Sequence, residues 1–260
     1  MAGVSLAVRP ANWPMRLVWA GFALYLAYAL SHLDFTPARF ITGLEFGQKF
    51  VAKLFPPDFH RWELLVKGLK ESLEMAILAS ALGLLASLPL SLLGARNLMP
   101  AWITWPARLV MVVCRSFHPV IVAIVFVKAV GFGALAGILA LTVASVGFLG
   151  KLFTEAIEEI SLKQVEAVRA TGAPFMSVVV FGVLPQVFAR FIGFASYELD
   201  ANLRNSTMVG IVGAGGIGGT LFAAFQRFDY DFVCAIILSI IAMIVVGEVL
   251  TNTVKRVFRV

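Results

Sequence analysis

Long apolar stretches follow one another along this chain, separated by short polar connections. Six of them span residues 15–31, 72–93, 105–127, 129–150, 175–199 and 232–251. A helix of about 20 mostly apolar residues crosses the hydrocarbon core of a membrane. The pattern therefore predicts an all-α integral membrane protein with about six transmembrane helices. The first stretch lacks a clear small-x-small cleavage site, so we expect it to be retained as a helix.

Composition supports a membrane protein and argues against several other classes. Hydrophobic residues make up 60% of the chain and charged residues 14%, outside the usual soluble range. The net charge of +6 comes from bases at segment ends, with no basic stripe between aromatics, so no nucleic acid is expected. Cys114 and Cys234 both lie in apolar runs without a nearby histidine, so we expect no metal site.

Lysine and arginine in the short connections indicate orientation, because such loops stay in the cytoplasm. Lys151, Lys163 and Arg169 fall between the fourth and fifth stretches. We therefore expect a multi-pass protein of the bacterial inner (plasma) membrane with both termini in the cytoplasm. The segment 32–71 mixes aromatics with charges of both signs and is broken at 55–58. It is predicted to lie in the outer membrane interface, and contact with a binding protein is a compatible alternative.

A short helix is predicted in the long polar connection that starts at Lys151. Ser161 and Gln164 can form a capping box that starts it. Gly172 can take the left-handed conformation that ends it, and Pro174 prevents continuation. Its small side chains suit docking in the groove of a partner, although a plain amphipathic loop helix is the simpler alternative.

The residues from 166 to 185 resemble the EAA loop of ABC importer permeases. Glu166, Ala167, Gly172, Leu184 and Pro185 match its spacing, while Val168 and Gly182 replace an Ala and an Ile of the motif. The resemblance implies that the loop 151–185 couples the chain to an ATPase subunit.

Nucleotide binding is not expected on this chain. Its Gly150-Lys151 pair has Ser145 where a P-loop needs glycine and Leu152 where it needs Ser or Thr. ATP and Mg are therefore expected on a separate ATPase subunit, and we predict no catalytic residue and no cofactor here.

Further motifs are similar to those of the phosphonate transport permease family. They lie at 55–59, 114–117, 169–173, 182–186 and 212–218, with Asn202, Arg204, Ser206 and Thr207 in an Asn-x-Arg-x-x-Thr-like pattern. The resemblance implies a type I ABC importer permease that works as a homodimer, with two ATP-binding cassette subunits and a periplasmic substrate-binding protein. Phosphonate, phosphite or hypophosphite is the implied cargo. His118-Pro119 departs from the family pattern and favours the smaller anions.

The resemblance and the intramembrane charges together predict a translocation pathway. Arg115 and His118 could line an aqueous route and hold an oxyanion, or Arg115 could snorkel or pair with a distant glutamate. Asp200 and Arg204 stand four residues apart and can pair on one helical face, which is also a purely structural possibility. With Asn202, Ser206 and Thr207 they complete the predicted pathway.

The glycine-rich segment 207–225 predicts irregular backbone. Gly213, Gly215, Gly216 and Gly218 fit GxGxxG, but no strand or βαβ unit surrounds them, so a dinucleotide site is not expected. We predict a short re-entrant or broken helix at the dimer axis near the outer gate. Tight packing against the fifth helix is the alternative.

Two domains follow from this organisation: residues 1–71 hold the N-terminal tail, first helix and periplasmic interfacial segment, and 72–260 form the permease core. Other functions stay open. The chain could be an ABC permease for another small solute, or a channel or proton-coupled carrier without an ATPase. A carrier usually has acids near mid-membrane, whereas the acids here cluster mainly at helix ends.

Overall fold

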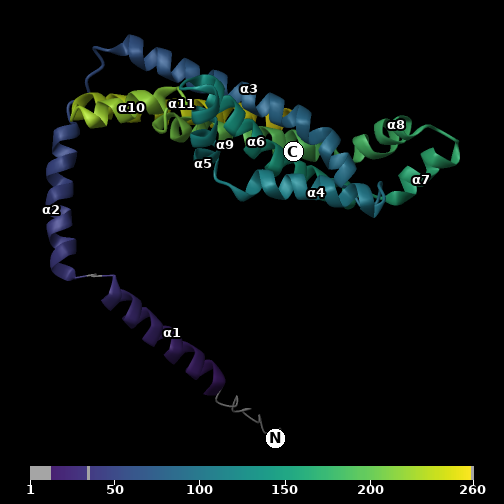
Figure 1. Ribbon diagram of the computed structural model, residues 1–260, viewed down its shortest axis with the longest axis horizontal. Coiled ribbons are helices and arrows are strands. Elements are labelled where there is room, and N and C mark those ends of the chain that lie inside the picture. Colours follow the sequence, from purple (N-terminus) through teal and green to yellow (C-terminus); the bar gives the residue numbers. More distant parts are fainter. Residues whose placement is uncertain (1–12, 34–35, 259–260) are drawn as a thin grey trace, which may run out of the picture. The chain divides into compact units, whose positions relative to one another are not determined.

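A computed structural model describes residues 13–33 and 36–258, and all regular structure among them is helical. The all-α prediction is thus confirmed, whereas both termini, predicted to be cytoplasmic, lie outside the described residues. The elements are α1 (Trp13–His32), α2 (Pro37–Leu54), α3 (Trp62–Gly94), α4 (Ala101–Ser116), α5 (Pro119–Val130), α6 (Ala134–Glu158), α7 (Leu162–Ala170), α8 (Phe175–Val178), the π-helical segment η1 (Val179–Val183), α9 (Leu184–Ile211), α10 (Ile217–Gln226) and α11 (Tyr230–Phe258) (Figure 1).

The chain divides into two compact units between Lys53 and Leu54. The expected domain boundary after residue 71 lies inside α3, which runs without a break from Trp62 to Gly94. The first unit contains α1 and nearly all of α2, and no residue of α1 is buried in it. The second unit contains the other helices and the buried core.

Four helical segments of the described chain are long and apolar enough to cross a membrane, and a fifth is possible if one bent pair counts as a span. They correspond to α3, α6, the run from α8 to α9, α11 and the bent pair α4–α5. The described residues thus contain four or five such segments, against about six predicted for the whole chain. The first predicted stretch does form the helix α1, but α1 is not among these segments. The helix contains Arg16 and several tryptophan and tyrosine residues.

The third predicted stretch, 105–127, is not one continuous helix. It breaks between α4 and α5, whose axes differ by 90°. Phe117 and His118 both adopt extended backbone there. Pro119 disfavours helical backbone in the residue before it and is well suited to begin a helix. The ring Nδ1 of His118 accepts a hydrogen bond from the Val120 N–H, which caps α5.

Small residues hold the second unit together, and the most extensive contact joins α3 to α6. Ser72, Ala76, Ala79 and Gly83 recur along one buried face of α3. A Cβ added at Gly83 would overlap the Cβ of Ser145 on α6. Glycine at this position therefore lets two membrane helices approach closely.

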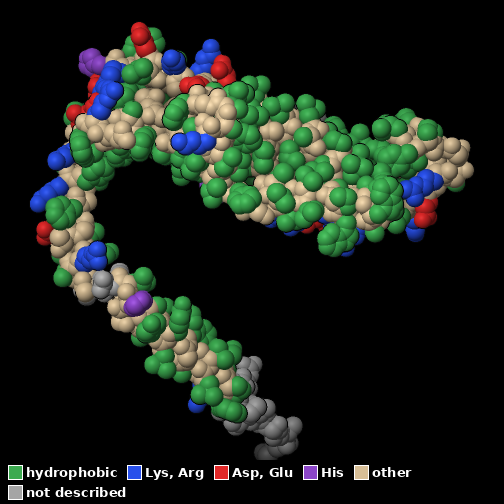
Figure 2. Space-filling model, viewed as in Figure 1, with side chains coloured by type: hydrophobic (Ala, Val, Ile, Leu, Met, Phe, Trp, Pro, Cys, Tyr) green, Lys and Arg blue, Asp and Glu red, His purple; other side chains and the backbone are tan. Residues whose placement is uncertain are grey.

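The two ends of the second unit carry most of its charge. Hydrophobic side chains cover its middle in Figure 2, while lysine, arginine and acidic side chains gather mainly toward the ends. The helices α7 and α8 lie at one end and α10 at the other (Figure 1). We call these the α7 end and the α10 end.

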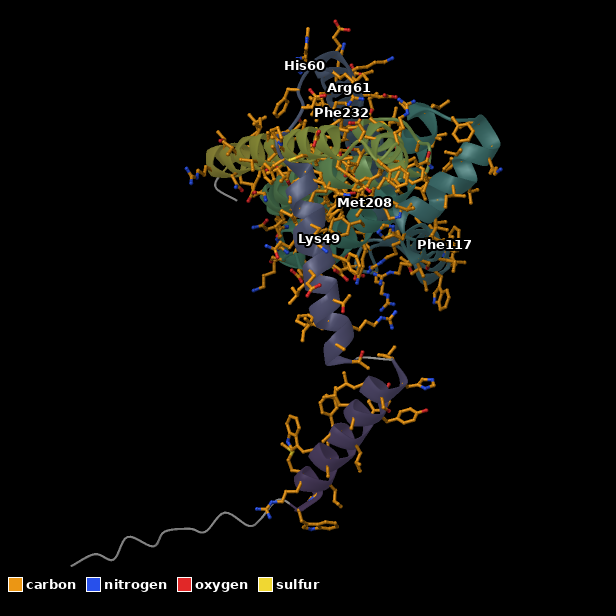
Figure 3. All side chains as sticks on the ribbon, turned by 90° about the vertical axis from the view of Figure 1, so that its left-hand side faces the viewer. Lys49, His60, Arg61, Phe117, Met208 and Phe232 are labelled. Carbon is orange, nitrogen blue, oxygen red and sulfur yellow. The ribbon has the colours of Figure 1, made fainter. Side chains whose placement is uncertain are left out.

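At the α10 end, the break predicted at 55–58 is confirmed, since α2 ends at Leu54 and α3 begins at Trp62. Arg61 pairs with Asp229 at 2.5 Å and stacks on the ring of Phe232, 3.9 Å from its centroid (Figure 3). The N–H and ring of His60 both bond to the Asp58 carboxylate, which lowers the pKa of Asp58. The contacts of Arg61 tie the start of α3 to the turn before α11 and to its first residues.

Candidate functional site

The predicted coupling helix is present as α7, although its start differs from the expectation. Ser161 is the N-cap residue, but its hydroxyl makes no capping hydrogen bond, so the predicted capping box is wrong. The side-chain amide of Gln186 binds the backbone of Ser161 instead, including the N–H that Gln164 was expected to reach. Its oxygen accepts from the Ser161 N–H at 3.0 Å, and its NH₂ donates to the carbonyls of Ser161 (3.3 Å) and Gly182 (2.6 Å).

The predicted end of this helix is confirmed. Gly172 has φ of +74°, and its N–H donates to the carbonyl of Arg169 at 2.9 Å. Nothing lies within 4 Å of a Cβ built at Gly172, so the demand for glycine is set by the backbone. Pro174 then stands at the N-cap of α8.

The side chains of α7 divide into an anchored face and an open face. Val165 is buried, and a Cβ at Gly182 would lie 3.3 Å from the Cα of Val165. Glycine in place of the isoleucine of the EAA motif therefore lets η1 pack directly on α7. Glu166 and Ala167 are exposed on the other face.

Leu184 and Pro185, the last two residues of the predicted motif, begin α9 directly after η1. Proline lacks the N–H that a continuous α-helical ladder would need, which accounts for a π-helical turn before it. Both residues are exposed. The motif residues therefore lie together at the α7 end, on α7, its closing turn and the start of α9.

The predicted pathway residues lie at the end of α4, at the start of α5 and along α9. Arg115 lies in the last turn of α4, whereas His118 caps α5 beyond the bend. Asp200 and Arg204 form the predicted ion pair at 2.8 Å on α9. Thr207 bonds to the carbonyl of Arg204 in its own helix. Arg115 borders a cavity whose described lining does not include His118, and a shared anion site for the two stays a prediction.

Asn202 and Ser206, also predicted for the pathway, are buried inside the second unit. The NH₂ group of Asn202 donates to Ser80 of α3 and to Ser145 of α6, at 2.9 Å each. Ser145 in turn donates to the buried carboxylate of Glu198 at 2.5 Å. We call Ser80, Ser145, Glu198 and Asn202 the polar cluster. Sequence reasoning missed its two serines, because nothing in their local pattern indicates which distant residue they face.

The glycine segment is broken, as predicted. The helix α9 ends at Ile211, and an apolar α10 of only 10 residues follows a tight turn. Gly213, Gly215 and Gly216 have positive φ angles of 91°, 82° and 76°. Gly218 instead packs so closely on the backbone of Thr207 that a Cβ would overlap it. The placement of this segment at a dimer axis stays a prediction.

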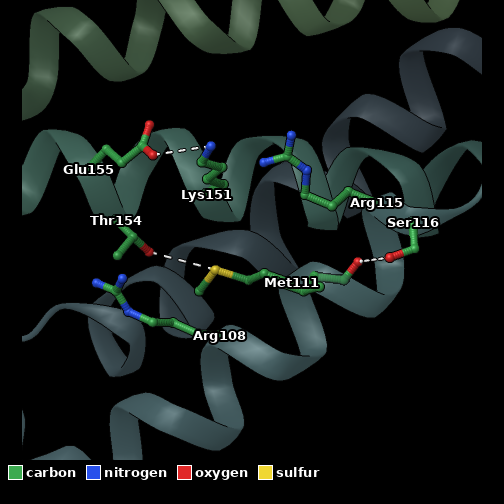
Figure 4. Close-up of a pocket in the computed structure, with 8 residues that line it drawn as sticks. Arg108, Met111, Arg115, Ser116, Lys151, Thr154 and Glu155 are labelled. Atoms are coloured by element: carbon green, nitrogen blue, oxygen red, sulfur yellow. Dashed lines mark hydrogen bonds and ion pairs between the residues drawn. The ribbon is translucent and has the colours of Figure 1, made fainter.

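A cavity of about 450 Å³ lies between α4 and α6. Lys151 pairs with Glu155 at 3.3 Å beside it, and Thr154 donates to the sulfur of Met111 at 3.7 Å. Figure 4 shows the guanidinium of Arg115 extending toward Lys151. The residues that line this cavity are Arg108, Met111, Val112, Arg115, Ser116, Lys151, Thr154 and Glu155.

Known proteins resemble this chain over most of its length. The family model of the binding-protein-dependent transport system inner membrane component matches residues 87–259. A phosphite transport system permease protein of Stutzerimonas stutzeri is 38% identical over 240 residues, covering 92% of this chain and 86% of that protein. A phosphate-import permease protein of Mycolicibacterium smegmatis is 36% identical over 205 residues, covering 78% of this chain and 38% of that protein.

Solved structures resemble the chain in fold. An inward-facing structure of the MetNI methionine ABC transporter matches with a TM-score of 0.69 and 23% identity, covering 77% of this chain and 99% of that one. An amino acid ABC transporter with histidines matches with a TM-score of 0.61 and 20% identity, over 75% of this chain and 94% of that one. At these identities the likeness establishes the fold alone.

Proposed function

Because this chain belongs to the family of binding-protein-dependent transport system inner membrane components, we propose that it forms the translocation pathway of an ATP-driven importer of phosphorus oxyanions. It is a non-catalytic permease subunit, and ATP with Mg is hydrolysed on a separate subunit. Its cargo is phosphonate, phosphite or hypophosphite. The name of the phosphite transport relative, at 38% identity, supports this substrate class.

The observation that carries the proposal is the geometry of α7. A short helix is fixed at its start by Gln186, held by the buried Val165 and closed by the positive φ of Gly172. Its opposite face leaves Glu166 and Ala167 free at one end of the membrane unit. A rigid, small-sided helix in that position suits the groove of an ATPase. It favours an ATP-driven importer over a channel or a proton-coupled carrier.

The complete transporter contains a second copy of this permease, two ATP-binding cassette subunits and a periplasmic binding protein. The α7 end faces the cytoplasm in the inner membrane, with both chain termini on that side, and the α10 end faces the periplasm. ATP binding closes the two ATPases and moves both α7 helices, and the cavity between the permeases turns outward. Hydrolysis resets it. The glycine turn at 212–216 packs near the outer gate.

Cargo selection within the permease rests on its arginines. Arg204 is already paired with Asp200, so an anion reaching it must compete with that carboxylate. Arg115 has no described hydrogen bond or ion pair within residues 13–33 and 36–258, so its charge is the more available of the two. His118, Asn202, Ser206 and Thr207 belong to the same pathway in this proposal.

The experiment is ATP-dependent uptake in proteoliposomes that contain the permease, its ATPase and the binding protein. Wild type should import phosphonate, phosphite or hypophosphite. Arg115→Ala should reduce uptake more than Arg204→Ala, and both should keep the ATPase bound, since neither residue lies at the α7 end. Failure to import any of the three anions would refute the substrate class. Undiminished uptake in both variants would remove these arginines from the pathway.

A further inference from the structure

The cavity between α4 and α6 is built by one face of each helix. Arg108, Met111 and Arg115 recur along α4 at spacings of three or four residues. Lys151, Thr154 and Glu155 recur in the same way along α6. Residues at this spacing share a helical face, so these side chains of α4 and α6 border one space.

Glycines set the distance between these two helices. A Cβ at Gly147 would lie 2.7 Å from the backbone nitrogen of Arg115, and one at Gly150 would lie 3.2 Å from Cγ of Met111. Because α6 has no side chain at these points, α4 rests directly on it. The backbone of Arg115 is therefore fixed against α6, and its side chain emerges at the rim of the cavity.

Positive charge exceeds negative charge around the cavity. Arg108 is neutralised by Glu158 at 2.6 Å, and Lys151 by Glu155 at 3.3 Å. Arg115 has no described partner, so three cations face two carboxylates. A charge within an apolar segment is costly unless water or a counter-charge meets it. The cationic side chains around the cavity therefore outnumber the carboxylates by one.

The positions of Arg115 and Lys151 along their helices can be given relative to the Arg108–Glu158 ion pair. Arg108 and Glu158 form the pair that joins α4 to α6. Arg115 stands seven residues after Arg108 on α4, and Lys151 stands seven residues before Glu158 on α6. Two helical turns span about 10 Å. Each therefore lies about 10 Å inward from its own member of the Arg108–Glu158 pair. The contact of Gly147 with Arg115 places the Arg115 backbone about one turn further inward than Lys151, within reach of a long side chain.

We propose that this cavity is a binding site for a tetrahedral phosphorus oxyanion, held in a fork by Arg115 and from the other side by Lys151. Guanidinium binds two oxygens of a phosphate-like group at once, and ammonium acts as a point charge. The anion takes the place of Glu155 beside Lys151, while Arg108 stays with Glu158. Two sources carry this chemistry: the free cargo anion and the phosphate of an acidic lipid headgroup.

This inference rests on the proposed function, since it names where the permease itself holds a phosphorus oxyanion. It concerns α4 and α6 only. The polar cluster and the Asp200–Arg204 pair are outside it. The assignment of Arg115 and Lys151 to an anion site is therefore tested separately from transport.

The test is equilibrium binding to the full-length permease complex in nanodiscs. One arm titrates radiolabelled inorganic phosphate and phosphite into discs of phosphatidylcholine. The other arm counts phosphatidylglycerol retained by the complex in native mass spectrometry. Arg115→Ala and Lys151→Gln should each weaken binding in one of the two arms by at least about tenfold, because a hydrogen bond to a charged group is lost. Arg115→Lys should recover part of the loss, since charge remains without the fork.

The matched control is Lys70→Gln. Lys70 forms an exposed i, i+4 pair with Glu74, as Lys151 does with Glu155, but it lies on α3 away from the cavity. It should leave both arms unchanged. Loss of free-anion binding identifies the cargo as occupant, and loss of phosphatidylglycerol alone identifies the lipid.

Wild-type binding in neither arm, or equal binding by wild type and both cavity variants, would overturn the site. Transport separates the two ideas. Normal uptake with unaltered binding in the variants would leave the importer intact and remove this site. Anion binding that depends on Arg115 in a complex that imports none of the three anions would keep the site and reject the proposed function.

Discussion

The polar cluster links three membrane helices through a single amide. The NH₂ group of Asn202 bridges Ser80 on α3 and Ser145 on α6, with both distances at 2.9 Å. Asn202→Ala removes both interhelical hydrogen bonds. Such bonds contribute on average about 0.6 kcal/mol in membrane proteins and at most about 1.7 kcal/mol. We therefore expect Asn202→Ala to lower the free energy of unfolding by about 1–2 kcal/mol.

A double-mutant cycle isolates the bond to Ser145. Asn202→Ala and Ser145→Ala, alone and together, should show a coupling energy of about 0.6 kcal/mol. The loss of the separate Ser145–Glu198 bond occurs in both arms of the cycle and cancels. Reversible unfolding of the permease in bicelles by steric trapping measures these free energies.

The control cycle pairs Asn202→Ala with Ser87→Ala. Ser87 is also buried on α3, but its hydroxyl donates to the carbonyl of Leu84 in its own helix at 2.9 Å. This pair should show no coupling. A coupling of Asn202 to Ser145 no larger than that of the control would refute the reasoning that the amide joins the helices.

Three further predictions concern the ends of the second unit and the topology. Gly172→Val should weaken ATPase assembly about tenfold in pull-downs, because a left-handed φ costs an L-residue about 1–2 kcal/mol, whereas Gly172→Asn should stay near wild type; equal assembly by both would count against docking at α7. Arg61→Ala should cost about 1 kcal/mol in thermal unfolding, since its ion pair to Asp229 and its ring stacking are partly exposed, and an unchanged unfolding temperature would show that they contribute nothing. Single cysteines at Lys163 and Lys53 in a cysteine-free background should react with an impermeant reagent from opposite sides of the membrane, and labelling of both from the same side would overturn the proposed topology.

Local features of this chain could be predicted because their causes are local. Apolar length set four of the spans, since transfer of side chains into hydrocarbon depends on each segment's own composition. The helix α7 and its end at Gly172 followed from turn chemistry, and the Asp200–Arg204 pair from the helical repeat. The break at 55–58 followed from its prolines. The first predicted stretch likewise forms a helix, α1, which is not among the segments that meet the length and hydropathy of a span together.

Only the tertiary structure decided which faces meet. The 90° bend at Phe117 and His118 interrupts an apolar run that reads as one helix. Gln186, 25 residues after Ser161, accepts the Ser161 N–H that the side chain of Gln164 was expected to reach. Glu198 and Arg115 are both charges in apolar segments, yet one is buried in a hydrogen-bonded cluster and the other borders an open cavity. The close approach of one helix to another at glycines such as Gly147 sets these environments. The register between two helices that are far apart in the chain leaves no periodic signal in the sequence of either helix.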